Sequence, residues 1–224
     1  DLVLGSEHAT VYRRTELKEL ARMHVMDGSG QGTLTESEVR VMVGTLELAE
    51  KRVENAMIPI DNVKMLSMDQ VLDGATLAEI FAWGKSRIPV FLRDPSHVVG
   101  FLMVKNLIIV SHEDAMRVRD VANICLKSLT RVRAGMPLFD LLKVFQKEKT
   151  HMALVVEASD SDAEKMPHLL SAEHKNVGLI TMEDIIEEIL QEEIEDETDA
   201  DGVGDVMQNM ATKYMQERME RSSS

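Results

Sequence analysis

Apolar positions in the first quarter of the chain recur with the spacing of an α-helix. Over residues 13–26, one side of the predicted helix carries Leu17, Leu20, Ala21 and Val25. A Gly-rich turn follows, and Thr35 and Glu38 then form the capping-box pattern that opens helices. The sequence therefore predicts two helices, with the second beginning after Thr35 and carrying apolar residues as far as Leu48.

The rest of the chain alternates short β-rich apolar runs with amphipathic helices, and it does so twice. The matching runs are residues 84–91 and 98–110 in the first unit, and residues 148–157 and 176–190 in the second. A helix is expected ahead of each first run, opening near Gly74 and near Gly135. One unit is too small to bury a core alone. Two units packed as one body, with a crevice where related strand ends meet, predict an α+β fold.

The resemblance between the two units extends to single positions. The stacked pairs are Gly100 with Gly178, Asn106 with Asp184, Ser86 with Thr150, and Val90 with Leu154. The second unit has the longer polar loop, at residues 158–175. A glycine and a polar residue six places later therefore recur in both units.

Charge and cysteine content narrow the range of functions. The formal net charge is −14, but twelve of the 39 acidic residues lie between Glu183 and Asp205, where there is no Lys or Arg. The other 27 nearly balance the 25 basic residues, so no basic stripe is available for polymeric nucleic acid. The single Cys125 excludes an intramolecular disulfide, favours a reducing compartment and is expected to be buried. Neither a signal peptide nor a membrane span is expected.

Four stretches carry motifs of a known family. They are TESEVRVMVGTLELAEKRVENAMIP ahead of the first unit, GKSRIPVF, KEKTHMALVV, and VGLITMEDIIEEILQEEIEDETD. In these the chain resembles the CBS-domain pair (Bateman module) of the cyclin M/CorC family of magnesium and cobalt transport mediators. The resemblance implies α+β tandem CBS domains, two βαββα-like units packed as one module and preceded by two helices. It divides the chain into a linker with helices at 1–52, CBS domains at 53–125 and 126–194, and an acidic tail at 195–224.

The resemblance also implies a function and a location. Family members carry a membrane domain ahead of this region, so the chain is expected to be the cytosolic regulatory part of an integral membrane protein. That protein would transport magnesium or another divalent cation. ATP with its Mg²⁺ is expected to bind between the CBS units and to couple occupancy to transport, without catalysis. By analogy with other CBS pairs, the chain is expected to form a homodimer through its CBS domains.

The family pattern assigns a nucleotide site residue by residue. Thr181 and Asp184, spaced T-x-x-D, match its nucleotide signature: the Thr181 hydroxyl would face the phosphates, and Asp184 would accept hydrogen bonds from the ribose hydroxyls. From the first unit, Arg87 would supply a cation for phosphate, Ser86 a hydroxyl, and Pro89 part of the wall.

Two further positions complete the expected site and differ from the family pattern. Backbone groups near Ile58 and Leu179 would frame the adenine, but Ile58 stands where family members often have Thr, so one hydroxyl contact is lost. Lys85 replaces an aromatic residue or His and could add phosphate charge.

The repeat predicts that the mirror-related crevice is empty. It would use His151, Met103 and Asn106. Met103 offers no hydroxyl and Asn106 no anionic charge, so one nucleotide per chain is expected. Magnesium would be held by the ATP phosphates and not directly by protein ligands.

Other interpretations stay open. The loop at residues 158–175 could make the chain a dimerising, phosphatase-docking platform with a degenerate nucleotide pocket. Residues 27–38 imitate a calcium-binding EF-hand loop, although Thr35 and Glu38 explain its second half as a helix cap. Residues 206–221 could form a further helix. No nucleophile elbow, P-loop or metal-ligand spacing supports an enzyme.

Overall fold

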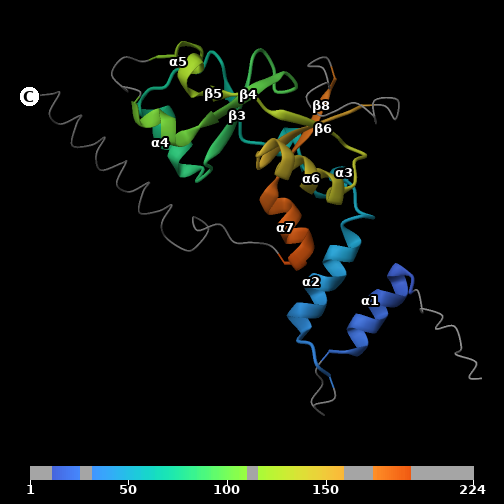
Figure 1. The fold of residues 1–224 in the computed structure, drawn as a ribbon. Coiled ribbons are helices and arrows are strands. Elements are labelled where there is room, and N and C mark those ends of the chain that lie inside the picture. The colour runs from blue at the N-terminus through green and yellow to red at the C-terminus, as the bar shows by residue number, and fades with distance from the viewer. Residues whose placement is uncertain (1–11, 26–31, 110–115, 159–173, 193–224) are drawn as a thin grey trace, which may run out of the picture.

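The computed structural model describes residues 12–25, 32–109, 116–158 and 174–192 (Figure 1). Within these ranges the chain forms two four-stranded sheets, each accompanied by helices, and two further helices precede them. The predicted α+β architecture of two similar units preceded by two helices is confirmed. Figure 1 shows the helices α1 and α2 extending away from the two sheets.

In chain order the elements are α1 (Arg14–Met23), α2 (Glu36–Glu47), α3 (Val53–Ala56), β1 (Ile58–Pro59), η1 (Ile60–Asn62), β2 (Leu66–Ser67), α4 (Gly74–Ala82), β3 (Arg87–Phe91), β4 (Val98–Met103), η2 (Val104–Ile109), α5 (Val118–Cys125), β5 (Leu126–Lys127), β6 (Thr130–Arg133), α6 (Leu138–Glu148), β7 (Met152–Val156), β8 (Asn176–Thr181) and α7 (Met182–Leu190). Among these described elements, no helix has both the length and the apolar character needed to cross a membrane.

The two units exchange short strands: each sheet includes a two-residue strand that directly precedes the other unit in the sequence. The sheet of the first unit has the order β2-β3-β4-β5, and the sheet of the second has the order β1-β8-β7-β6. β1 precedes the first unit but pairs with β8, and β5 precedes the second unit but pairs with β4. This exchange of strands ties the units together and places Ile58 in the second unit's sheet.

The glycines matched between the units lie where the exchanged strands cross. A Cβ atom at Gly100 would lie 2.4 Å from the carbonyl oxygen of Lys127 in β5. A Cβ atom at Gly178 would lie 2.8 Å from the carbonyl oxygen of Ile58 in β1. Only glycine allows the two backbones to approach this closely, so the recurrence of glycine has a packing cause.

The stacking of Val90 with Leu154 is wrong by one residue. Val90 lies opposite Gly100 in the first sheet, whereas Val155 lies opposite Gly178 in the second. The pairing register shifts immediately after both valines. Val90 and Val155 are therefore the equivalent positions.

The stacking of Ser86 with Thr150 is wrong for the same reason. In both units the chain between helix and strand passes through a left-handed residue, Gly84 with φ 63° and Lys149 with φ 52°. Counting from these two residues makes Ser86 equivalent to His151. The sequence comparison aligned Ser86 with Thr150 because both carry a hydroxyl group. The register of a sheet is set instead by which side chains face the core.

Apolar clusters fill each unit and join the two. The cluster between the sheets has as its buried members Val98, Leu129, Met152, Leu154 and Leu179. Cys125 is fully buried in the first unit's core, as predicted, and burial raises the pKa of its thiol. A raised pKa lowers the thiolate fraction, so this cysteine is structural and not reactive.

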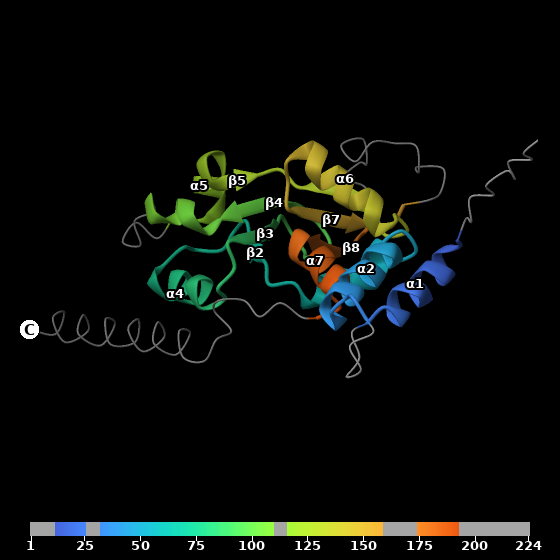
Figure 2. The ribbon, with the colours of Figure 1, turned by 60° about the horizontal axis from the view of Figure 1, so that its bottom comes forward.

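The helix α1 packs on α2, and α2 packs on α7 (Figure 2). The predicted capping box at the start of α2 is confirmed, because the Glu38 carboxylate accepts hydrogen bonds from the Thr35 backbone N–H (2.7 Å) and hydroxyl (2.8 Å). A Cβ atom at Gly44 would lie 2.2 Å from the carbonyl oxygen of Ile189. The missing side chain therefore lets α2 approach the C-terminal end of α7.

Candidate nucleotide site

Thr181 and Asp184 meet at the junction of β8 and α7. Thr181 ends the strand and is the N-cap of the helix, and Asp184 is its third residue. One carboxylate oxygen of Asp184, Oδ2, accepts hydrogen bonds from the Thr181 backbone N–H (2.6 Å) and hydroxyl (2.9 Å). The spacing T-x-x-D thus forms a capping box that fixes both side chains at a helix N-terminus, where anions are favoured.

The other carboxylate oxygen of Asp184 accepts no hydrogen bond from the described residues. The side chain is half-buried, and this burial raises the pKa of Asp184 above its usual range. The neighbouring carboxylates of Glu187 and Glu183 add to the rise, while the hydrogen bonds from Thr181 oppose it. A ligand with two adjacent hydroxyl donors would supply what this anion lacks, because charged acceptors form strong hydrogen bonds.

Ile58 and Leu179 lie directly opposite each other in the pairing of β1 with β8. Leu179 is buried, whereas the Ile58 side chain is 40% exposed. Gly178, next to Leu179, keeps β1 close to β8. The structure therefore brings Ile58, Leu179, Thr181 and Asp184 together at one end of the second sheet.

Ser86, Arg87 and Pro89 belong to the other sheet. Arg87 and Pro89 lie on β3, where Pro89 is buried and Arg87 half-buried, and the exposed Ser86 directly precedes the strand. Within the described residues, the Arg87 side chain forms no hydrogen bond or ion pair, so its guanidinium can bind an anion. No hydrogen bond between described residues joins these three to Asp184, and their contribution to one shared site stays a prediction. Lys85, by contrast, has a partner.

The mirror-related position has a different local structure. Where the second unit continues from β8 into α7, the first continues from β4 into the 3₁₀-helix η2. Met103 stands where Thr181 stands in the second unit, and it has no oxygen with which to cap a helix. Asn106 lies within η2, and its carbonyl oxygen lies 3.8 Å from the Cys125 sulfur. The described part of the run, residues 98–109, is therefore a strand and a 3₁₀-helix, and the capping geometry found at Asp184 is not repeated there.

No group of three or more His, Cys, Asp or Glu side chains able to hold a metal occurs in the described ranges. The first part of the EF-hand-like sequence, residues 27–31, lies outside those ranges. Its last acidic residue, Glu38, is used in the cap of α2, and the hydrogen bonds from Thr35 lower its pKa. The loop at 159–173 and the tail from 193 onwards also lie outside the described residues.

Sequence reasoning missed the contact between α2 and α7. Gly44 gave no signal, because one glycine in a helical pattern identifies no partner. The contact becomes evident only when α7, more than 130 residues later, is placed beside α2. It connects the helix that begins at the candidate site to the N-terminal helical pair.

The chain resembles a number of curated proteins and solved structures, of which two of each are described. The DUF21 domain-containing protein At4g14240 of Arabidopsis thaliana is 35% identical over 256 residues, covering 89% of this chain and 51% of that protein. The metal transporter cnnm-1 of Caenorhabditis elegans is 36% identical over 222 residues, covering 96% of this chain and 26% of that protein. The chain thus spans about half the length of these relatives, or less. No protein-family model matches it.

The solved structures are CBS domains. That of a bacterial CNNM/CorC family Mg²⁺ transporter is 26% identical with a TM-score of 0.62, and the match covers 83% of this chain and all of that one. A structure of such a domain in complex with ATP is 29% identical with a TM-score of 0.55, covering 68% of this chain and 96% of that one.

The exchanged strands, the paired units and the capped T-x-x-D motif define this chain as a CBS-domain pair. The relatives and the solved structures place it more narrowly. The chain belongs to the CNNM/CorC family of metal-transport proteins, and the resemblance stated from the sequence is confirmed.

Proposed function

We propose that this chain is the cytosolic regulatory module of a membrane transporter for magnesium or another divalent cation. It binds ATP with Mg²⁺ between its two CBS units and couples occupancy to transport, without catalysing a reaction. The carrying observation is Asp184, a half-buried carboxylate with one oxygen held by Thr181 and the other without a donor among the described residues. An ATP complex of a related CBS domain supports the choice of ligand.

The residues present suit the parts of a nucleotide. The free oxygen of Asp184 would accept the ribose hydroxyls, and the first turn of α7 would direct backbone N–H groups toward the phosphates. Arg87, which has no partner among the described residues, would neutralise phosphate charge. Ile58 offers backbone groups but no hydroxyl, so this wall would bind the base through the strand edge alone.

Magnesium fits this site as a companion of the phosphates. The described residues hold no ready cluster of metal ligands, and Mg²⁺ commonly retains waters and phosphate oxygens as ligands. Glu183, Asp184 and Glu187 surround the start of α7 with negative charge. Metal-free ATP would be repelled there, so Mg²⁺ and ATP should bind cooperatively.

The helix α7 is the proposed route from ligand to transporter. Its first turn carries Asp184, and its last turn packs against α2 near Gly44. Occupancy that shifts or stiffens α7 would therefore reach the helical pair, which precedes the CBS units in sequence. In the proposed full-length protein, the membrane domain lies upstream of this pair. This is a population shift, in which the ligand favours one arrangement of α7 and α2.

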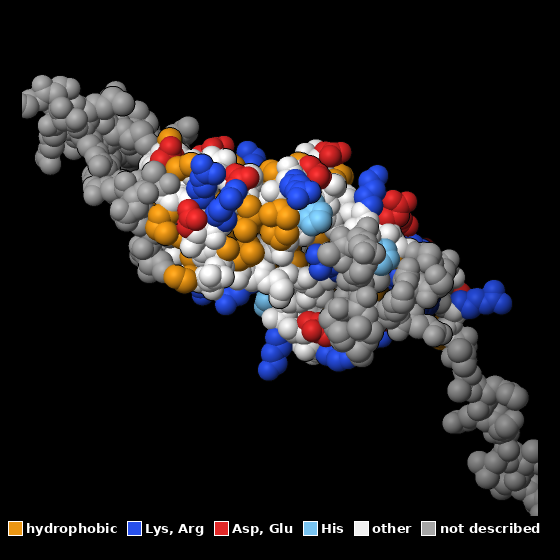
Figure 3. Space-filling view, turned by 90° about the horizontal axis from the view of Figure 1, so that it is seen from above, with side chains coloured by type: hydrophobic (Ala, Val, Ile, Leu, Met, Phe, Trp, Pro, Cys, Tyr) orange, Lys and Arg blue, Asp and Glu red, His pale blue; other side chains and the backbone are white. Residues whose placement is uncertain are grey.

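Homodimerisation through the CBS domains is part of the proposal. Figure 2 shows α5 and α6 along the edge opposite α2 and α7. Their large apolar side chains Ile124 and Phe139 are 62% and 41% exposed. Figure 3 shows apolar side chains gathered among charged ones on one face. Exposed apolar side chains of this size are suited to burial against a second copy.

Calorimetry with ATP, with and without Mg²⁺, tests the nucleotide site. We expect one site per chain, tighter binding with Mg²⁺, and loss of binding in Asp184→Ala and Asp184→Asn. Glu183→Ala is the matched control, since it removes an exposed carboxylate from the same turn. It should keep one Mg-ATP site per chain, and it should bind metal-free ATP no more weakly than the wild type does. Folding of every variant is checked by circular dichroism.

Absence of binding in the folded wild-type protein would favour the alternative function, a dimerising and docking platform with a degenerate pocket. The loop at residues 158–175 would then be the first segment to delete in a search for a protein partner.

A further inference from the structure

A row of polar contacts runs along the interface between α7 and α2. It consists of Lys51 with Glu188, Glu47 with Gln191, and Arg40 with Glu192. As the chain leaves α7, its partners move from Lys51, which follows α2, to Glu47 at the C-terminal end of α2 and then to Arg40 in its N-terminal half. Glu192, the last described residue of this region, therefore lies beside Arg40 in the N-terminal half of α2, the helix that packs on α1.

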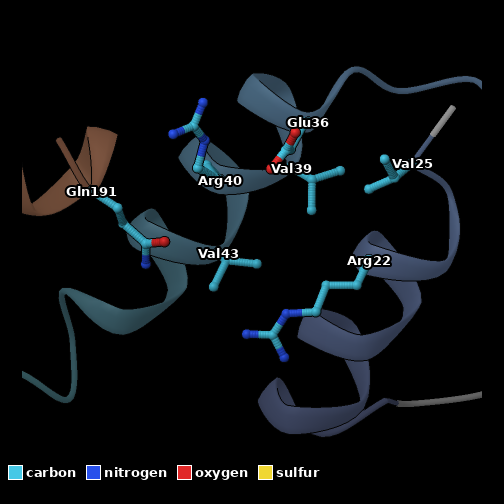
Figure 4. A pocket seen from close by; sticks show the side chains of 7 residues that line it. All are labelled: Arg22, Val25, Glu36, Val39, Arg40, Val43 and Gln191. Atoms are coloured by element: carbon cyan, nitrogen blue, oxygen red, sulfur yellow. The ribbon is translucent and has the colours of Figure 1, made fainter. Parts of the chain in front are cut away.

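A cavity of about 300 Å³ lies at the end of this row (Figure 4). It is lined by Arg22 from α1, by Val25 just after that helix, by Glu36, Val39, Arg40 and Val43 from α2, and by Gln191. Figure 4 shows Val39 and Val43 between Arg40 and Arg22, with Val25 on one side and Gln191 on the other. The lining thus combines an apolar floor with two guanidinium groups.

Contacts with the described residues leave both arginines able to bind a further anionic group. The Arg40 guanidinium contacts Glu192, but its Nε atom is buried and has no hydrogen-bond partner. Among the described residues, Arg22 pairs only with Glu19 in its own helix, and both side chains of that pair are more than half exposed. Such exposed pairs contribute little and exchange easily. The cavity therefore offers binding capacity for an anionic group attached to an apolar one.

The residues that follow Glu192 in the sequence combine acidic side chains with an apolar one. Residues 193–205 carry seven acidic side chains and no Lys or Arg, and Ile194 stands between Glu193 and Glu195. Two extended residues span about 7 Å, so Ile194 can lie at most about that far from Glu192. This length is comparable to the width of a cavity of about 300 Å³.

We propose that residues 193–197 dock in this cavity, with Ile194 against the valines and the flanking carboxylates on Arg22 and Arg40. The docked segment fastens α1 to the end of α7. This contact is independent of nucleotide binding and sets how firmly the helical pair is held against the CBS units.

Cysteine cross-linking in the full chain tests this proposal directly. Val25→Cys combined with Ile194→Cys should form an intramolecular disulfide readily under mild oxidation, measured by gel shift and peptide mass spectrometry. The matched control is Met23→Cys with Ile194→Cys, because Met23 is 80% exposed and does not line the cavity. Positions 23 and 25 are nearly equally far from 194 along the chain, so tethering alone favours neither. Equal or slower cross-linking at position 25 would overturn the proposal.

A second measurement tests the charge contribution. Adding Arg22→Glu to the cross-linking pair should slow disulfide formation several-fold, and so should raising the salt concentration. Arg14→Glu is the control, since Arg14 lies in the same helix, is exposed and does not line the cavity. If both charge reversals have the same effect, the arginine does not hold the segment.

Discussion

At the scale of single residues, Asp184 serves the fold and the candidate site in conflicting ways. It caps α7 through Thr181, yet burial and two neighbouring carboxylates disfavour its charge. A carboxyl with a raised folded-state pKa stabilises the protein most below its unfolded pKa. That contribution is lost as the pH rises through the folded pKa. The charged Asp184 carboxylate therefore lowers the stability of the ligand-free protein at neutral pH, at a position where it could accept hydrogen bonds from a ligand.

Asp184→Asn should accordingly leave the ligand-free protein as stable as the wild type at neutral pH, or more stable. The amide oxygen can still accept from Thr181, while the buried charge is removed. Thermal unfolding of both proteins from pH 3 to 8 measures this, and the difference should grow in favour of the variant as the pH rises. A variant that is less stable at neutral pH would show that the charge contributes more to capping than its burial costs.

Thr181→Ala tests the cap itself. Loss of the hydroxyl removes one member of the capping box and should lower the free energy of unfolding by about 1 kcal/mol. Thr181→Ser keeps the hydroxyl and serves as the control. Urea denaturation measures both, and equal stability of the Ala and Ser variants would mean that Asp184 alone satisfies the helix end.

At the scale of elements, the sequence predicted the units but not the strands exchanged between them. Long periodic segments such as α2 and α6 were evident from apolar spacing, and the capping residues marked where α2 and α7 begin. The strands β1 and β5 have only two residues each and therefore show no periodicity. Their pairing is a long-range contact, and only the recurring glycine hinted at it.

Gly178→Ala should weaken the second sheet. The added Cβ would lie 2.8 Å from the Ile58 carbonyl oxygen and 2.6 Å from the Met57 sulfur. Because backbone must move to make room, we expect a loss of about 1–3 kcal/mol in the free energy of unfolding. Gly135→Ala is the control, since its nearest neighbour would be an Arg52 side-chain nitrogen at 3.8 Å. Equal urea midpoints for the two variants would contradict the close crossing of β1 over β8.

At the scale of the whole molecule, the sequence could predict that Thr181 and Asp184 lie together, but it could not predict where the residues of the other sheet lie relative to them. Thr181 and Asp184 are three residues apart, so local helix geometry joins them. Arg87 belongs to the other sheet, and its distance from Asp184 depends on how the two sheets pack. The one-residue error at Ser86 has the same origin, because strand register is set by pairing across the sheet and not by local sequence.

The connection from the nucleotide site to the helical pair passes through one short helix. α7 has nine residues, with Asp184 in its first turn and Ile189 against Gly44 of α2. A ligand that orders the first turn should also order the last, since a helix of this length moves as one piece. Mg-ATP should therefore slow amide hydrogen exchange in α2 as well as in α7. Exchange in α5, which packs on β4 and β5 in the first unit, should change less.

Gly44→Leu separates coupling from binding. The side chain would meet the backbone of α7 and push α2 away, without touching Asp184 or Arg87. We expect ATP affinity within a few-fold of wild type, while the ATP-dependent protection of α2 is lost and that of α7 remains. If ATP protects α2 equally in both proteins, the signal reaches the helical pair by another path. If it protects α2 in neither, α7 does not carry the signal and the coupling part of the proposed function fails, although nucleotide binding stands.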